Sequence, residues 1–76
     1  MRGYSQHFVE ANEQADALNI GVLLGRLCIH KKYPAVNVAK DLGISRQAVY
    51  YYFLGRCKPA KEREIKIAEL IQMLSE

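Results

Sequence analysis

The fold of this chain is decided by residues 35–59, which read AVNVAKDLGISRQAVYYYFLGRCKP. The segment begins with a run of helical period, whose apolar members are Val36, Val38, Ala39 and Leu42. Gly43 ends this run, because glycine adopts a positive φ without a Cβ penalty. Ser45 is a favourable N-cap for a second helix. The pattern therefore predicts two short helices, 35–42 and 45–54, joined by a tight glycine turn.

The second predicted helix has two chemically different sides. At 3.6 residues per turn, one side collects three core-type residues: Ala48, Val49 and Tyr52. The other side carries hydrogen-bonding and aromatic groups: Arg46, Gln47, Tyr50, Tyr51 and Leu54. This arrangement is typical of the helix-turn-helix, whose second helix lies in the DNA major groove.

The spacing resembles the helix-turn-helix of the Cro/C1-type repressors, also called the XRE family. The matching positions run from the small residue between the helices, through the turn, to a closing G-x-x-x-P: Ala39, Gly43, Ile44, Ser45, Val49, Tyr52, Gly55 and Pro59. Apolar matches in the flanking helices extend the resemblance to about residues 20–72. Ala35 and Phe53 depart from the family, which often has a glutamine and a glutamate at these positions.

The resemblance implies an all-α fold, a compact bundle of four to five helices like the lambda-repressor DNA-binding domain. Apolar periodicity predicts helices at about 5–17, 19–31, 35–42, 45–54 and 60–75, with no strands. The expected inward faces of the first two are Phe8, Ala11, Ala15 and Leu18, then Ile20, Leu23, Leu24, Leu27 and Cys28. Gly21 and Gly25 suit positions where another helix approaches closely. Residues 1–76 form one domain, with 1–18 as an N-terminal extension.

The exposed face of helix 45–54 supplies the candidates for base recognition. Gln47 can pair bidentately with adenine, and Arg46 can pair with guanine or reach only a phosphate. Tyr50 and Tyr51 can contact thymine methyls and phosphates, or one of them packs on the flank of the domain. In the resembled family, the positions of Arg46, Gln47 and Tyr51 commonly contact bases.

Basic charge gathers around the same segment. The chain carries a net charge of +3, but residues 21–61 hold eight lysines and arginines against one acidic residue. Together with the motif, such an excess favours binding to DNA phosphates, and the alternative is a solvated lysine-rich surface. The candidates for phosphate contact are Lys40, Ser45, Arg56, Lys58 and Lys61. Ser45 is included because the positive start of a helix attracts phosphate, and the others flank the motif or follow it in the closing loop.

Several other classes of function find no support in the sequence. His7 and His30 have no partner at metal-ligand spacing, and no C-x-x-C, H-E-x-x-H or glycine-rich phosphate loop occurs. We therefore expect no enzyme, no metal and no cofactor. Cys28 fits a core position and Cys57 an exposed free thiol. The chain has no signal peptide and no apolar run near ~20 residues, so we expect a cytoplasmic protein of a bacterium or a phage-infected cell.

The last predicted helix carries more apolar residues than one face can hold: Ile65, Ile67, Ala68, Leu70, Ile71, Met73 and Leu74. This surplus predicts a homodimer, formed through this helix or the N-terminal extension.

The expected partner is double-stranded DNA, with no small-molecule effector. The expected function is a Cro-like transcriptional repressor. The alternatives are a protein-interaction module, such as an antitoxin or a phage protein acting on a host factor, and an accessory of DNA packaging or replication.

Overall fold

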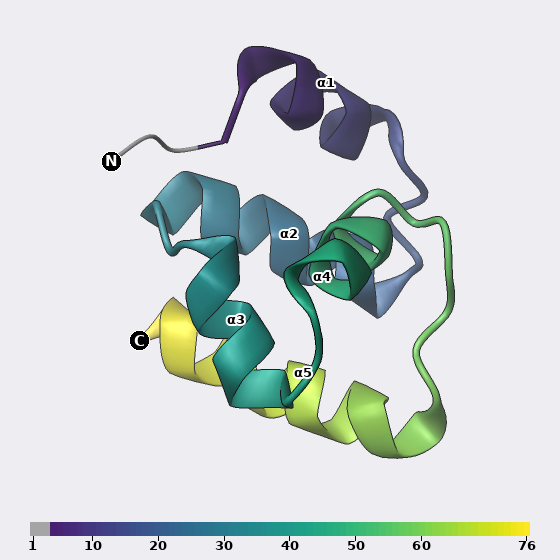
Figure 1. Ribbon diagram of the computed structural model, residues 1–76, viewed down its shortest axis with the longest axis vertical. Helices are drawn as coiled ribbons and strands as arrows, with labels where there is room; N and C mark the ends of the chain where they lie inside the picture. Colours follow the sequence, from purple (N-terminus) through teal and green to yellow (C-terminus); the bar gives the residue numbers. More distant parts are fainter. Residues whose placement is uncertain (1–3) are drawn as a thin grey trace.

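Five α-helices make up the computed structural model, which describes residues 4–76 (Figure 1). The helices are α1 (Gln6–Gln14), α2 (Ile20–Lys31), α3 (Ala35–Leu42), α4 (Arg46–Phe53) and α5 (Lys61–Ser75). Helix α2 contacts α1, α4 and α5, and α3 packs on α4 and α5. Residues 4–76 contain no strand, so the predicted all-α bundle is confirmed. The first three residues of the predicted N-terminal extension lie outside the described part.

The ends of the helices follow from local chemistry. Ser45 Oγ accepts a hydrogen bond of 3.1 Å from the Ala48 N–H, which confirms Ser45 as the N-cap of α4. At the end of α3, Gly43 has a φ of 68°. The Ile44 N–H then bonds back to the Ala39 carbonyl at 3.0 Å, as in a Schellman ending. The observed bounds of α3 agree with the predicted range.

The core lies between α2, α3, α4 and α5. Its buried apolar side chains are Val22, Leu24, Cys28, Ala35, Val38, Ala39, Leu42, Val49, Phe53, Ile67 and Leu70. Phe53 is fully buried, whereas Tyr52 is only half-buried. Tyr52, predicted on the core side of α4, packs against the edge of the core without being fully buried, and the sequence analysis missed Phe53 as the second fully buried residue of this helix. Phe53 lies four residues after Val49, so these two share one face of the helix.

The predicted inward faces of the first three helices contained further errors. Helix α1 ends at Gln14 instead of about residue 17, so Leu18 lies in the connection to α2 and is 93 % exposed. Ala11 is also exposed. In α2 and α3, Leu23 and Val36 face outward, while the fully buried Val22 takes a core position on α2.

Polar groups hold α1 onto the rest of the bundle. Asn12 is fully buried on α1, and its Nδ2 donates to the carbonyls of Phe53 at 2.7 Å and Val22 at 3.3 Å. Asn12 and Phe53 can lie this close to α2 because residue 25 is a glycine. A Cβ there would meet Asn12 Nδ2 and Phe53 Cγ at 2.8 Å. Arg26 Nη2 reaches the Glu13 carbonyl at 2.8 Å, where α1 leaves unpaired acceptors. Asn12 thus connects α1 directly to the end of α4.

Candidate nucleic-acid interface

One hydrogen bond organises the outward face of α4. Gln47 Nε2 donates to the hydroxyl of Tyr51 at 2.9 Å, and both side chains are exposed. The two residues are four positions apart, which places them one above the other on a helix. Arg46 is exposed beside them. The structure therefore brings Gln47 and Tyr51 together as a pair.

The paired Gln47 amide keeps the groups that an adenine edge requires. An amide NH₂ has two hydrogens and its oxygen has two lone pairs. The bond to Tyr51 uses one hydrogen, which leaves Gln47 Oε1 free to accept and a second N–H free to donate. Adenine offers a donor at N6 and an acceptor at N7 in the major groove. The Tyr51 hydroxyl keeps its own hydrogen for a phosphate or a base.

Tyr50 differs from Tyr51, although the two are neighbours on α4. The ring centroids of Tyr50 and Phe8 lie 5.2 Å apart at an interplanar angle of 73°, an edge-to-face contact between α4 and α1. Tyr50 is 36 % exposed and Tyr51 is 41 % exposed. Packing of one tyrosine on the flank of the domain, which was one of two alternatives, thus describes Tyr50. Leu54 is the C-cap of α4 and is half-buried.

The predicted phosphate-contacting residues lie at exposed positions on three parts of the chain. Lys40 is on α3, Arg56 and Lys58 are in the connection between α4 and α5, and Lys61 begins α5. Ser45 is exposed at the start of α4, where its oxygen already accepts from the Ala48 N–H. Its hydroxyl hydrogen stays available to a phosphate oxygen.

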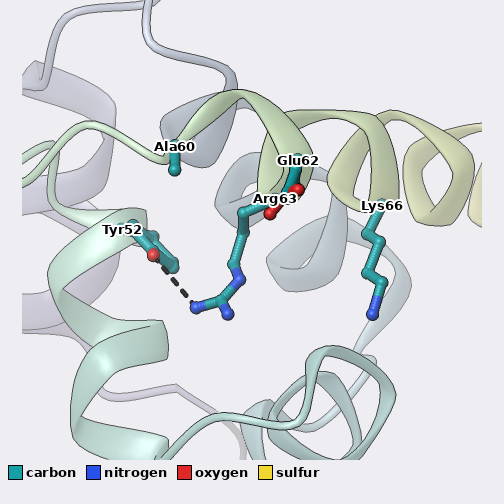
Figure 2. A pocket seen from close by; sticks show the side chains of 5 residues that line it. All are labelled: Tyr52, Ala60, Glu62, Arg63 and Lys66. Atoms are coloured by element: carbon teal, nitrogen blue, oxygen red, sulfur yellow. Dashed lines mark hydrogen bonds between the residues drawn. The ribbon is translucent and has the colours of Figure 1, made fainter.

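Two basic residues beyond the motif were missed by the sequence analysis. Arg63 extends from α5 toward Tyr52 on α4, and Lys66 lies one turn further along α5, beside Arg63, as Figure 2 shows. Arg63 Nη1 lies 3.4 Å from the Tyr52 hydroxyl. The spacing of Arg63 and Lys66, three residues apart on a helix, is the signal that places them on one side. The family pattern gave no reason to consider them.

No protein-family model, curated protein or solved structure matches this chain. Within residues 4–76, no group of three or more His, Cys, Asp or Glu side chains could hold a metal ion. No helix in the same range is long and apolar enough to cross a membrane. What the protein does must therefore be inferred from the side chains described above.

Proposed function

We propose that this protein is a sequence-specific DNA-binding regulator of transcription, which reads operator DNA with α4. The observation that carries the proposal is the exposed Gln47–Tyr51 pair on a helix anchored from behind by Val49 and Phe53. Helix α3 and the Gly43 turn precede that helix, in the order of a helix-turn-helix. A hydrogen-bonding pair on a rigid helix suits base recognition, because bidentate contacts need fixed donors and acceptors.

Charge supports the same proposal. The exposed lysines and arginine named above flank α4 on both sides in the sequence. Contacts of this kind carry affinity without sequence preference, whereas Gln47 and Arg46 supply the preference. We assign the protein to the Cro-like repressors, which act by occupying operator DNA over a promoter; an activator would bind DNA through the same kinds of contact. It would act in the cytoplasm, where that DNA lies.

We also propose that the protein binds DNA as a homodimer. Ile65 and Met73 on α5 are each more than half exposed, although both are large apolar residues. Covering them with a second copy would remove apolar surface from water. Two recognition helices about 34 Å apart could then enter successive major grooves.

A protein-interaction module is the second candidate. Tyr51 adds an exposed ring to the outward face of α4, and aromatic side chains are also common in protein interfaces. Leu18, Leu23 and Val36 add exposed apolar surface elsewhere. This candidate requires that substitutions on α4 leave DNA binding unchanged and abolish capture of a protein partner.

The phosphate contacts test DNA binding directly. Replacing Lys58 or Lys61 with Ala should weaken binding to all duplexes alike and make the negative slope of log K against log salt shallower by about 0.9 per lost contact. Lys31→Ala is the matched control, because Lys31 is an exposed lysine at the far end of α2. Slopes unchanged in both variants would remove these lysines from the interface, and no binding by the parent protein would refute the proposed function.

A further inference from the structure

An open hollow of about 440 Å³ lies between α4 and α5. Tyr52 lines it from α4, and Ala60, Glu62, Arg63 and Lys66 line it from the start of α5 (Figure 2). The hollow is open to solvent, so its lining side chains, rather than its volume, indicate what it could bind. Four of the five lining side chains are polar, so the hollow suits a polar ligand.

Positive charge dominates this hollow. Arg63 and Lys66 extend into it from α5, whereas the Glu62 carboxylate lies beside the α5 ribbon in Figure 2. Two cations thus oppose one anion. Arg63 is half-buried, and its contact with Tyr52 at 3.4 Å is long and occupies one of its five donors. The Arg63 guanidinium makes no other hydrogen bond with the residues that line the hollow.

We propose that this hollow binds a phosphate group. The planar fork of Arg63 matches two phosphate oxygens, and Lys66 adds a second positive charge. Tyr52 accepts the Arg63 N–H with its oxygen, so its own hydroxyl hydrogen is free to donate to a third oxygen. Ala60, the N-cap of α5, provides no side-chain acceptor for the first-turn N–H groups, but Glu62 and Glu64 in the same turn offset their attraction for an anion, so the site depends on Arg63, Lys66 and Tyr52.

The DNA backbone is the preferred source of this phosphate. Tyr52 directly follows Tyr51 on α4, so the hollow lies along the flank of the helix that we propose enters the major groove. This choice of source rests on the proposed function, whereas the phosphate site itself rests on Tyr52, Arg63 and Lys66. A free phosphate or a small phosphorylated molecule would offer the same chemistry.

A titration with inorganic phosphate tests the site without DNA. Sodium phosphate should shift the backbone amide NMR signals of Tyr52 and residues 60–66, relative to sodium chloride at equal ionic strength. Arg63→Gln and Lys66→Gln should each abolish most of these shifts. Lys31→Gln, which removes one charge at the far end of α2, should keep them. The rest of each spectrum reports that the variant is folded.

The salt dependence of duplex binding identifies the source. If the DNA backbone supplies the phosphate, each of the two variants should make the negative slope of log K against log salt shallower by about 0.9, and Lys31→Gln should leave it unchanged. If phosphate shifts the amide NMR signals but the variants leave the slope of log K against log salt unchanged, the site is supported and its ligand is a free phosphate compound. Neither effect, or equal effects of all three substitutions, would overturn the site. A parent protein that binds no duplex would refute the proposed function, while the phosphate titration would still decide this inference.

Discussion

The side-chain amide of Gln47 donates a 2.9 Å hydrogen bond to the hydroxyl of Tyr51, one turn further along α4. Holding two exposed side chains in one geometry costs conformational entropy before any ligand arrives. A ligand that needs that geometry then binds more tightly, because the ordering is already complete. We therefore regard Tyr51 as a residue that positions Gln47, in addition to any contact of its own.

Tyr51→Phe tests this positioning role, because it keeps the ring and removes only the hydroxyl. Affinity for the preferred duplex should fall by about 0.5–1.5 kcal/mol, the usual net worth of a hydrogen bond. Binding to random DNA should change little. The Tyr51→Phe substitution should also cost less in a Gln47→Ala background than in the parent, since the two residues act together. Additive losses in this double-mutant cycle would show that Tyr51 acts independently of Gln47.

Asn12 should stabilise the fold through its contact with the end of α4. Asn12→Ala removes the donor to the buried carbonyls of Phe53 and Val22. We expect a loss of roughly 1–3 kcal/mol in the free energy of unfolding, measured by urea denaturation. The Asn12 Oδ1 atom is itself buried without a hydrogen-bond partner. Asn12→Ala should therefore reduce the free energy of unfolding by less than the loss of a fully hydrogen-bonded amide would. Gln72→Ala on the exposed side of α5 should change stability by less than about 0.5 kcal/mol. Similar changes in the free energy of unfolding for Asn12→Ala and Gln72→Ala would mean that the hydrogen bonds of Asn12 do not stabilise the fold.

Alkaline pH should destabilise the protein through Tyr33. The Tyr33 hydroxyl donates 2.6 Å to Asp41 Oδ2, and this bond, with some burial, raises the pKa of Tyr33 from 10.0 to about 12. Because the pKa of Tyr33 is higher in the folded state than in the unfolded state, the bond to Asp41 stabilises the fold fully below pH 10. This stabilisation is lost as pH rises toward 12. Burial also raises the pKa of Cys28 to about 12, so the decline begins nearer pH 9.

The melting temperature as a function of pH provides the measurement. Tyr33→Phe should melt lower than the parent at pH 7 and should lose less between pH 10 and 12. The melting curve of Tyr33→Phe should still fall at alkaline pH, because burial also raises the pKa of Cys28 and of Tyr4, and both remain in this variant. Parallel curves for the parent and Tyr33→Phe would show that the bond to Asp41 has no part in the alkaline transition.

The sequence was most informative where signals were local. The limits of α3, the Gly43 turn and the Ser45 cap all depend on residues within one or two turns of each other, and each was predicted correctly. The exposed positions of Gln47 and Tyr51 followed from helical period alone. The bond between them depends on side-chain rotamers, which periodicity does not specify.

The errors arose where distant parts of the chain meet. Asn12 is polar, so a search for apolar stripes passed over it, yet it is buried because its partner is the carbonyl of Phe53, 41 residues away. Leu18 looked like a core residue because the end of α1 at Gln14 carries no strong stop signal. Arg63 is a candidate phosphate-binding residue only because the fold places it near Tyr52, and the sequence pattern does not show this proximity.

The central claim, that α4 reads DNA bases, is tested most directly by Gln47→Ala. The affinity of this variant should be compared with that of the parent on two duplexes, one selected from random sequences by the parent and one of unrelated sequence. We expect a loss of about 1–3 kcal/mol on the selected duplex and a much smaller loss on the unrelated one, because phosphate contacts carry non-specific binding. Equal losses on the two duplexes, or none on either, would contradict base reading by α4.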